Sequence, residues 1–206
     1  MSNILLALTV VSFFVFFASS SPHIDLNPAL GKYQNLDECF PLRETWITLY
    51  RNYPWDPVFG GDATCIRESG TGPGVDGVYP ILSRFGNVSV EAKATFEASN
   101  GYTYAGHNIL KLTPDGGTDS IRIYVAYADC EKCAILRKTY ATVYFPNSYD
   151  QINGAPFSFF TTTNDACALL IPESQLGKNS TCCDFIFDLL CGSTPKYYMW
   201  NDNCRA

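Results

Sequence analysis

The chain has 206 residues and a formal net charge of −6, and 17% of its residues are charged. It contains no basic stretch, which excludes nucleic acid as an expected partner. Nine cysteines accompany only two histidines, so a mixed Cys/His zinc site has little to build with. We therefore expect neither a metal nor another cofactor.

An apolar run over residues 5–17 opens the chain and ends in small residues, from Ala18 to Ser21. The run is too short to span a bilayer comfortably, and small residues at its end suit signal peptidase, although no Arg or Lys precedes it. We expect residues 1–21 to be a signal peptide and residues 22–206 to form one domain. The protein is then secreted and has no membrane anchor.

Export changes how the cysteines and two short motifs are interpreted. Nine cysteines in a secreted chain indicate disulfides, with one thiol left unpaired or bonded to a partner. The triplets that begin at Asn87 (Asn-Val-Ser) and Asn179 (Asn-Ser-Thr) are glycosylation sequons. We expect a glycan at Asn87 and at Asn179.

The elements expected after a polar N-terminal arm and a short helix near Asn35 are mostly strands. The clearest is 87–97, where Val, Ala and Phe alternate with Ser, Glu, Lys and Thr. Runs of β-forming residues bounded by Gly and Pro predict further strands at 46–50, 78–82, 102–112, 120–128 and 133–140. Such spacing predicts an antiparallel barrel or sandwich, and an eight-stranded barrel can enclose one ligand.

Two later segments differ from this pattern. Residues 181–192 predict a helix, because Thr181 suits the N-cap, Asp184 the first turn and Gly192 the stop. Residues 140–163 are rich in aromatics and predict a long hairpin or loop between the last two strands. That segment is a lid over a cavity, a protein-binding surface, or ordinary strand.

Four places in the chain resemble the salivary lipocalins of ticks, a family that includes the histamine-binding proteins. They are the run from Asp56-Pro57-Val58-Phe59-Gly60 to Cys65, the run from Ala126-Tyr127-Ala128-Asp129 to Cys133, the pair Cys183 and Phe187, and the last cysteine, Cys204. The resemblance implies an all-β fold: an eight-stranded antiparallel lipocalin barrel with a short N-terminal helix and a C-terminal helix, stapled by disulfides.

The resemblance also implies disulfide pairs. It implies Cys65–Cys204 and Cys133–Cys183, with Cys167–Cys191 as a third pair. Cys39, Cys130 and Cys182 remain, and at most two of these three can pair with each other.

Binders of this family hold a cationic amine between carboxylates and aromatic rings. Tyr53, Asp56 and Phe59 match their cavity positions, although Asp56-Pro57 also suits a bend and both rings suit a core. The family's acids are missing at two other places: the segment 167–170 has none, and Ile123 stands where another is expected. An acid engineered at Ala168 is then expected to create amine binding.

A second ligand class follows from the strand at 120–128. If Arg122 and Tyr124 point inward, the guanidinium could hold the carboxylate of a fatty acid or eicosanoid. The alternation with Ile121, Ile123 and Val125 favours the other orientation, with Arg122 in solvent.

The resemblance implies a monomeric protein that sequesters a host mediator, a biogenic amine such as histamine or serotonin, and so blunts inflammatory and haemostatic defence. The alternatives are a scavenger of lipid mediators (fatty acid, leukotriene or thromboxane) and an inhibitor that binds a host defence protein through exposed loops. We do not expect an enzyme, because His107 has no evident partner, His23 lies in the arm, and no catalytic triad can be assembled.

Overall fold

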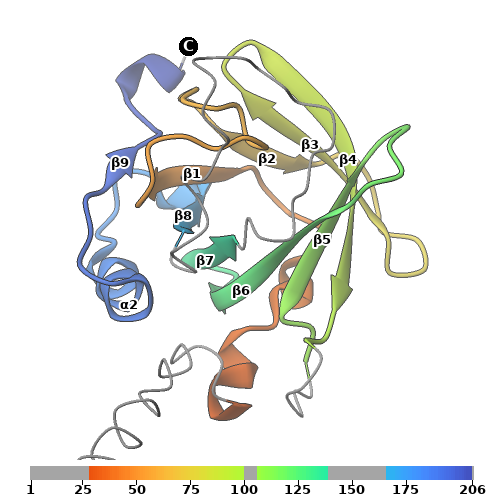
Figure 1. Cartoon of the computed structure of the whole chain (residues 1–206), viewed down its shortest axis with the longest axis horizontal. Coiled ribbons are helices and arrows are strands. Elements are labelled where there is room, and N and C mark those ends of the chain that lie inside the picture. Colours follow the sequence, from red (N-terminus) through yellow and green to blue (C-terminus); the bar gives the residue numbers. More distant parts are fainter. Residues whose placement is uncertain (1–27, 100–105, 139–165, 206) are drawn as a thin grey trace, which may run out of the picture.

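The computed structural model describes residues 28–99, 106–138 and 166–205. Its main feature is an antiparallel sheet that closes on itself, so that strands β1 to β8 form the predicted eight-stranded barrel (Figure 1). Each strand pairs with the next one along the chain. The strands are β1 (Trp46–Arg51), β2 (Arg67–Gly70), β3 (Tyr79–Phe85), β4 (Val88–Glu97), β5 (Ile109–Pro114), β6 (Ile121–Asp129), β7 (Cys133–Lys138) and β8 (Ala166–Pro172).

Strand β1 closes the barrel, because it pairs with β8 along one edge and with β2 along the other. The contact with β2 is short and joins Trp46 to Glu68 and Ile47 to Arg67. The rest of that edge is taken by β9 (Tyr197–Tyr198), which pairs with Tyr50 and Arg51. The C-terminal segment thus continues the sheet where β2 leaves it.

Short helices lie at both ends of the described chain. The short N-terminal helix is realised as two 3-10 helices, η2 (Pro28–Tyr33) and η3 (Leu36–Cys39), and further 3-10 turns are η5 (Glu173–Gln175) and η6 (Asp202–Arg205). The predicted C-terminal helix is confirmed as α2 (Thr181–Cys191), and it stops at Gly192, whose φ is 77°. Its N-cap is Ser180, so the prediction that Thr181 is the N-cap is wrong by one residue. No helix in the described ranges is both long and apolar enough to cross a membrane.

The hydrophobic residues form one core inside the barrel and another outside it. The inner core takes alternate residues of the strands, such as Leu110, Leu112 and Ile123. The outer core lies between α2 and the outer faces of β1, β7 and β8 (Figure 1). Phe187 of α2, Ile135 of β7 and Leu169 of β8 belong to it. Strand β8 is therefore buried on both faces and reads as a continuous apolar run.

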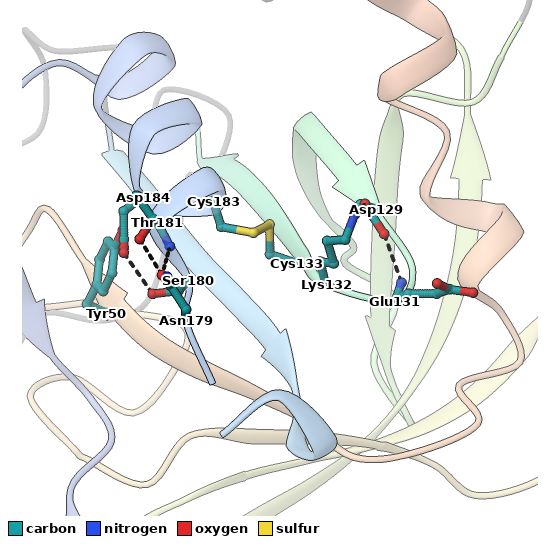
Figure 2. The surroundings of a disulfide bond; sticks show 10 residues. All are labelled: Tyr50, Asp129, Glu131, Lys132, Cys133, Asn179, Ser180, Thr181, Cys183 and Asp184. Carbon is teal, nitrogen blue, oxygen red and sulfur yellow. Dashed lines mark hydrogen bonds and ion pairs between the residues drawn. A yellow bond between two sulfur atoms is a disulfide. The ribbon is translucent and has the colours of Figure 1, made fainter. Parts of the chain in front are cut away.

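Four disulfides hold η3, α2 and the C-terminal tail to the barrel. They are Cys39–Cys130, Cys65–Cys204, Cys133–Cys183 and Cys167–Cys191, which include the three pairs implied by the family resemblance. Figure 2 shows Cys183, in the first turn of α2, bonded to Cys133 at the start of β7. Cys182 is left as an exposed free thiol.

The strand predictions hold to differing degrees. The strand over 87–97 is confirmed, and its alternation holds in the middle, where Ala92 and Ala94 are buried while Glu91 and Lys93 are exposed. It fails at the start, where Val88 is 52% exposed. The strand predicted at 102–112 begins only at Ile109: residues 106–108 are not strand, and residues 102–105 lie outside the described ranges. The short strands β2 and β9 were not predicted. The predicted signal peptide and the whole of the 140–163 segment lie outside the described residues.

Candidate functional site

The inside of the barrel holds a narrow cavity of about 60 Å³. Most of its wall is apolar, from Leu36, Phe40 and Leu42 near the N-terminal helices to the strand residues of the inner core. A ligand pocket normally measures about 300–1,000 Å³. Any ligand larger than a few water molecules must therefore displace side chains that line this cavity.

Two basic and two acidic side chains also line the cavity: Arg51 at the end of β1, Asp56 in the β1–β2 connection, Glu68 in β2 and Lys138 at the end of β7. Arg51 and Asp56 are 1% and 0% exposed. Burying a charge is costly unless it is paired, and charged residues are seldom fully buried in a structural core. These four residues are therefore the candidate functional site.

The sequence Asp56-Pro57-Val58-Phe59-Gly60-Gly61 folds into a compact turn that carries part of the site. The backbone of Asp56 pairs with that of Gly61 through two hydrogen bonds of 2.9 and 2.7 Å. Gly60 and Gly61 both have positive φ, and a Cβ on Gly60 would lie 2.8 Å from the Phe85 side chain. The glycines thus let the turn fold back and place Asp56 and Phe59 against the barrel interior.

The Asp56 carboxylate is the centre of this polar group. Its Oδ1 accepts the backbone N–H groups of Val58 (3.0 Å) and Phe59 (3.1 Å), and its Oδ2 accepts the Tyr53 hydroxyl (2.9 Å) and the Lys138 ammonium (2.5 Å). Burial by itself would raise the pKa of Asp56, but Lys138 and the two backbone donors outweigh it and lower the pKa to about 2. Asp56 is therefore ionised and fully hydrogen-bonded.

Lys138 completes an ion pair inside the barrel. Its ammonium also lies 3.6 Å from the centre of the Phe59 ring, which adds a cation–π contact. Burial lowers the pKa of Lys138, and the neighbouring Asp56 opposes that effect. The pair therefore keeps two charges in a place where neither would be stable alone.

Arg51 is the second cation of the site. Its Nη2 donates to the carbonyl oxygens of Pro54 (2.9 Å) and Gly61 (2.5 Å), and its guanidinium lies 5.0 Å from the Tyr53 ring. Its Nη1 is 3.9 Å from Asp56 Oδ2, which is too far for a hydrogen bond. Within the described residues, Nε and Nη1 have no hydrogen-bond partner.

Glu68 supplies the second carboxyl group. It is half-buried in the cavity wall and accepts a hydrogen bond from Ser83 on the neighbouring strand β3. Burial raises the pKa of Glu68 to about 7, although the Ser83 hydrogen bond and the Lys138 charge pull it down. The charge of the site therefore changes near neutral pH.

The structure places Tyr53, Asp56 and Phe59 in the cavity wall, where the family resemblance had put them. The bend that Asp56-Pro57 suits is also present, because Asp56 Oδ1 caps the turn that follows it. The bend and the cavity position of Asp56 are thus compatible, because the turn places the Asp56 carboxylate inside the barrel. Its role as a ligand contact stays a prediction.

The assignment of Arg122 and Tyr124 to the ligand site is wrong. Neither residue lines the cavity, and Arg122 is 42% exposed on the outer wall, where it pairs with Glu97 at 2.9 Å. Ile123 and Val125 take the inward positions in the inner core. The alternation of β6 therefore favoured the correct orientation, with Arg122 in solvent.

The two places where the family's amine-binding acids were expected are apolar parts of the wall. Ile123 lines the cavity, and so do Ala168 and Leu170 of the 167–170 segment. Both positions therefore contribute only apolar surface to the cavity wall.

Arg51, Glu68 and Lys138 were missed as site residues. Lys138 follows Ala134 and Leu136 at the spacing of two residues that puts side chains on one face of a strand. This two-residue spacing was enough to predict that the Lys138 side chain points into the barrel. The strand β2 that carries Glu68 has only four residues and gives little periodic signal.

A wider hollow of about 420 Å³ lies outside the barrel, beside the start of α2 and the β6–β7 turn seen in Figure 2. Its charged residues, Glu131, Lys132 and Lys178, are exposed to solvent. Because these three side chains are exposed, their charges carry little desolvation cost, unlike the charges inside the barrel. Within the described ranges, no group of three or more His, Cys, Asp or Glu side chains could hold a metal ion.

The predicted glycosylation sites are compatible with the fold. Asn87 lies in the exposed turn between β3 and β4, and Asn179 is exposed just before α2. The Asn179 side chain accepts hydrogen bonds from the backbone and the hydroxyl of Thr181 at the helix start (Figure 2). Glycosylation at both positions stays a prediction.

Comparisons with known proteins give little. No family model matches the chain, and no curated protein matches it. Among solved structures, the crystal structure of AM182 in complex with serotonin is similar at 12% sequence identity, with a TM-score of 0.47, and the match covers 78% of this chain and 84% of that chain. A match at this level says nothing about the ligand of this chain, so the site rests on its own geometry.

Proposed function

We propose that this protein is a secreted, lipocalin-type binding protein that sequesters a small amphipathic mediator inside its barrel, and that it is not an enzyme. The observation that carries the proposal is the group Arg51, Asp56, Glu68 and Lys138 inside an otherwise apolar barrel. A packed core gains nothing from these charges, whereas a ligand with a polar head and an apolar body could use both parts of the wall. Four disulfides support secretion.

Two mediator classes fit this scheme. A biogenic amine such as histamine or serotonin would need a carboxylate, and Glu68 is the candidate, because all four acceptor sites of Asp56 are occupied. A lipid mediator such as a fatty acid, leukotriene or thromboxane would place its acid near Arg51 and Lys138. In the feeding setting that the family resemblance implies, either ligand would be withdrawn from host inflammatory and haemostatic signalling.

The cavity must widen for either class. About 60 Å³ is free, so binding would move lining side chains such as Phe40 and Leu42, which are only partly buried against the inner core. A ligand that fills a barrel in this way binds the folded state alone. It should therefore raise the thermal unfolding midpoint in proportion to the logarithm of its concentration.

The test is native mass spectrometry of the secreted, glycan-trimmed protein with histamine, serotonin, arachidonic acid and a leukotriene, paired with thermal unfolding. We expect one ligand per chain and a higher midpoint with at least one of them. If all four leave the mass and the midpoint unchanged, small-molecule sequestration of these mediators is wrong.

A protein-directed inhibitor is the second candidate, and one observation favours it. Phe185 and Leu189 on α2 and Tyr198 on β9 are 67%, 55% and 62% exposed, which is unusual for large apolar side chains. The variant carrying Phe185→Ser and Leu189→Ser should then lose binding to a host defence protein while small-ligand binding stays intact. Unchanged host-protein binding by this variant would exclude the α2 surface.

A further inference from the structure

The Arg51 side chain is buried in the barrel with most of its hydrogen-bonding capacity unused. It is 1% exposed and lines the cavity, yet only Nη2 donates, to the carbonyls of Pro54 and Gly61. Nε and Nη1 carry three of the five guanidinium N–H donors, and within the described residues they have no hydrogen-bond partner. A buried donor without an acceptor is costly, which indicates that a ligand atom completes this group.

The charges around Arg51 do not cancel. Asp56 lies 2.5 Å from Lys138 but 3.9 Å from Arg51, so its negative charge is matched mainly to Lys138. Both oxygens of Asp56 already accept two hydrogen bonds each, which leaves no lone pair for the guanidinium. Around Arg51 the site thus has two cations, Arg51 and Lys138, and one carboxylate, Asp56, whose hydrogen-bond acceptor sites are all occupied.

Glu68 does not supply the missing negative charge. Its carboxyl oxygen accepts a hydrogen bond from Ser83, and the nearby cation that acts on it is Lys138. Its partial burial raises its pKa to about 7, so below neutral pH it is mostly uncharged. An anionic ligand would therefore meet a positive site.

We propose that the barrel selects anions over amines, and that its ligand is a monocarboxylate with an apolar body, whose carboxylate accepts hydrogen bonds from Nη1 and Nε of Arg51. The apolar body would lie along the inner wall, against Leu110, Leu112 and Ile123. This inference rests on the proposed function of the interior as a ligand site and names its ligand class. Arg51 is then the residue that determines specificity.

The test compares ligands that differ only in the head group. Serotonin and 5-hydroxyindole-3-acetic acid share a ring but carry opposite charges, and arachidonic acid and its methyl ester share a chain. Titration calorimetry on the disulfide-intact protein at pH 7 should give at least about tenfold tighter binding of the acid within the pair that fits the cavity. Which pair responds distinguishes an aromatic acid from a fatty acid.

Arg51→Gln removes the charge and should weaken binding of the acid by about tenfold or more while leaving the ester unchanged. The matched control is Arg122→Gln, the same change on the outer wall, which should alter neither ligand. Since Arg51→Gln could also disturb the fold, the comparison of head groups in the unaltered protein stands as an independent test.

The proposal is overturned if serotonin binds as tightly as its acid counterpart and the methyl ester as tightly as arachidonic acid. It is also overturned if a folded Arg51→Gln variant keeps the preference for the acid. Equal binding of both head groups would leave the proposed function intact, whereas binding of no ligand from either pair would remove the proposed function together with this inference.

Discussion

Lys138, the last residue of β7, forms an ion pair with Asp56, which lies 82 residues earlier in the β1–β2 connection. The pair lies inside the barrel, with side-chain exposures of 10% and 0%. It ties the connection between the first two strands to β7, which is separated from β1 by β8 alone. Its removal should therefore affect both folding and ligand binding.

Lys138→Met should destabilise the protein by about 3–5 kcal/mol, because it leaves the buried Asp56 carboxylate without its counter-charge. The measurement is urea unfolding with the disulfides intact. Lys93→Met is the matched control, since Lys93 pairs with Asp115 at 3.4 Å on the surface and both side chains are about half exposed or more. The control should lose less than about 1 kcal/mol, and equal losses for the two variants would contradict a special role of the buried pair.

Glu68 should make stability fall as the pH rises through neutrality. Its pKa is raised from 4.5 to about 7 in the folded protein, so folding is favoured while the group is protonated. The contribution is fully present below pH 4.5 and is lost as the pH passes 7. Glu68→Gln should flatten this dependence by on the order of 1–2 kcal/mol, because the group is only half-buried.

The measurement for Glu68 is the free energy of unfolding at pH 4.5 and pH 7.5, in the unaltered protein and in Glu68→Gln. Carboxylates with ordinary pKa values contribute equally to both proteins, so the difference between the two pH profiles isolates Glu68. Parallel profiles would show that Glu68 titrates in the folded protein as it does in the unfolded chain.

Cys182 should be the single reactive thiol of the secreted protein. It is exposed, and the other eight cysteines are paired. A thiol reagent should label one cysteine per chain in denaturant without reductant, and Cys182→Ser should change stability by less than about 0.5 kcal/mol. Absence of any free thiol would mean that Cys182 is bonded to another molecule.

Ala168→Glu should abolish binding of a carboxylate ligand. Ala168 on β8 lies directly opposite Arg51 on β1, so a carboxylate at this position would meet the unused guanidinium donors. This pairing changes the expectation that an acid at Ala168 alone creates an amine site. Amine binding should need Ala168→Glu together with Arg51→Met, and Ala168→Gln is the neutral control of the same size.

Serotonin titrations of these three variants check the prediction. The double variant should bind serotonin about tenfold or more tightly than Ala168→Gln, while Ala168→Glu alone should bind neither serotonin nor an acid well. Strong serotonin binding by Ala168→Glu alone would mean that Arg51 does not take up the new carboxylate.

Much of the barrel could be predicted from the sequence, but Arg51 could not, and the reason is local. Strict alternation from Trp46 through Thr48 would point Tyr50 inward and Arg51 outward. The pairing with β8 shifts between Thr48 and Tyr50, where Leu49 is an extra residue on β1. The bulge turns Tyr50 outward to Phe187 of α2 and brings Arg51 into the cavity.

The orientation of side chains on β2, β7 and β8 was also difficult to predict from the sequence. Strands β7 and β8 are buried on both faces, because α2 covers the outer side, so their side chains do not alternate between apolar and polar. Glu68 points inward only because its short strand is held between Trp46 of β1 and Ser83 of β3. Partners so distant in the chain leave no periodic trace in a four-residue strand.

The two-residue strand β9 pairs with an edge of the β-sheet that would otherwise be unpaired. It covers the part of β1 that β2 does not reach, and the nearby Cys65–Cys204 bond fastens the tail that carries it. A chain cut before Tyr197 would present unpaired backbone groups of Tyr50 and Arg51 to any passing strand. Removing the C-terminal segment for expression would therefore promote aggregation through β1, the strand that carries Arg51.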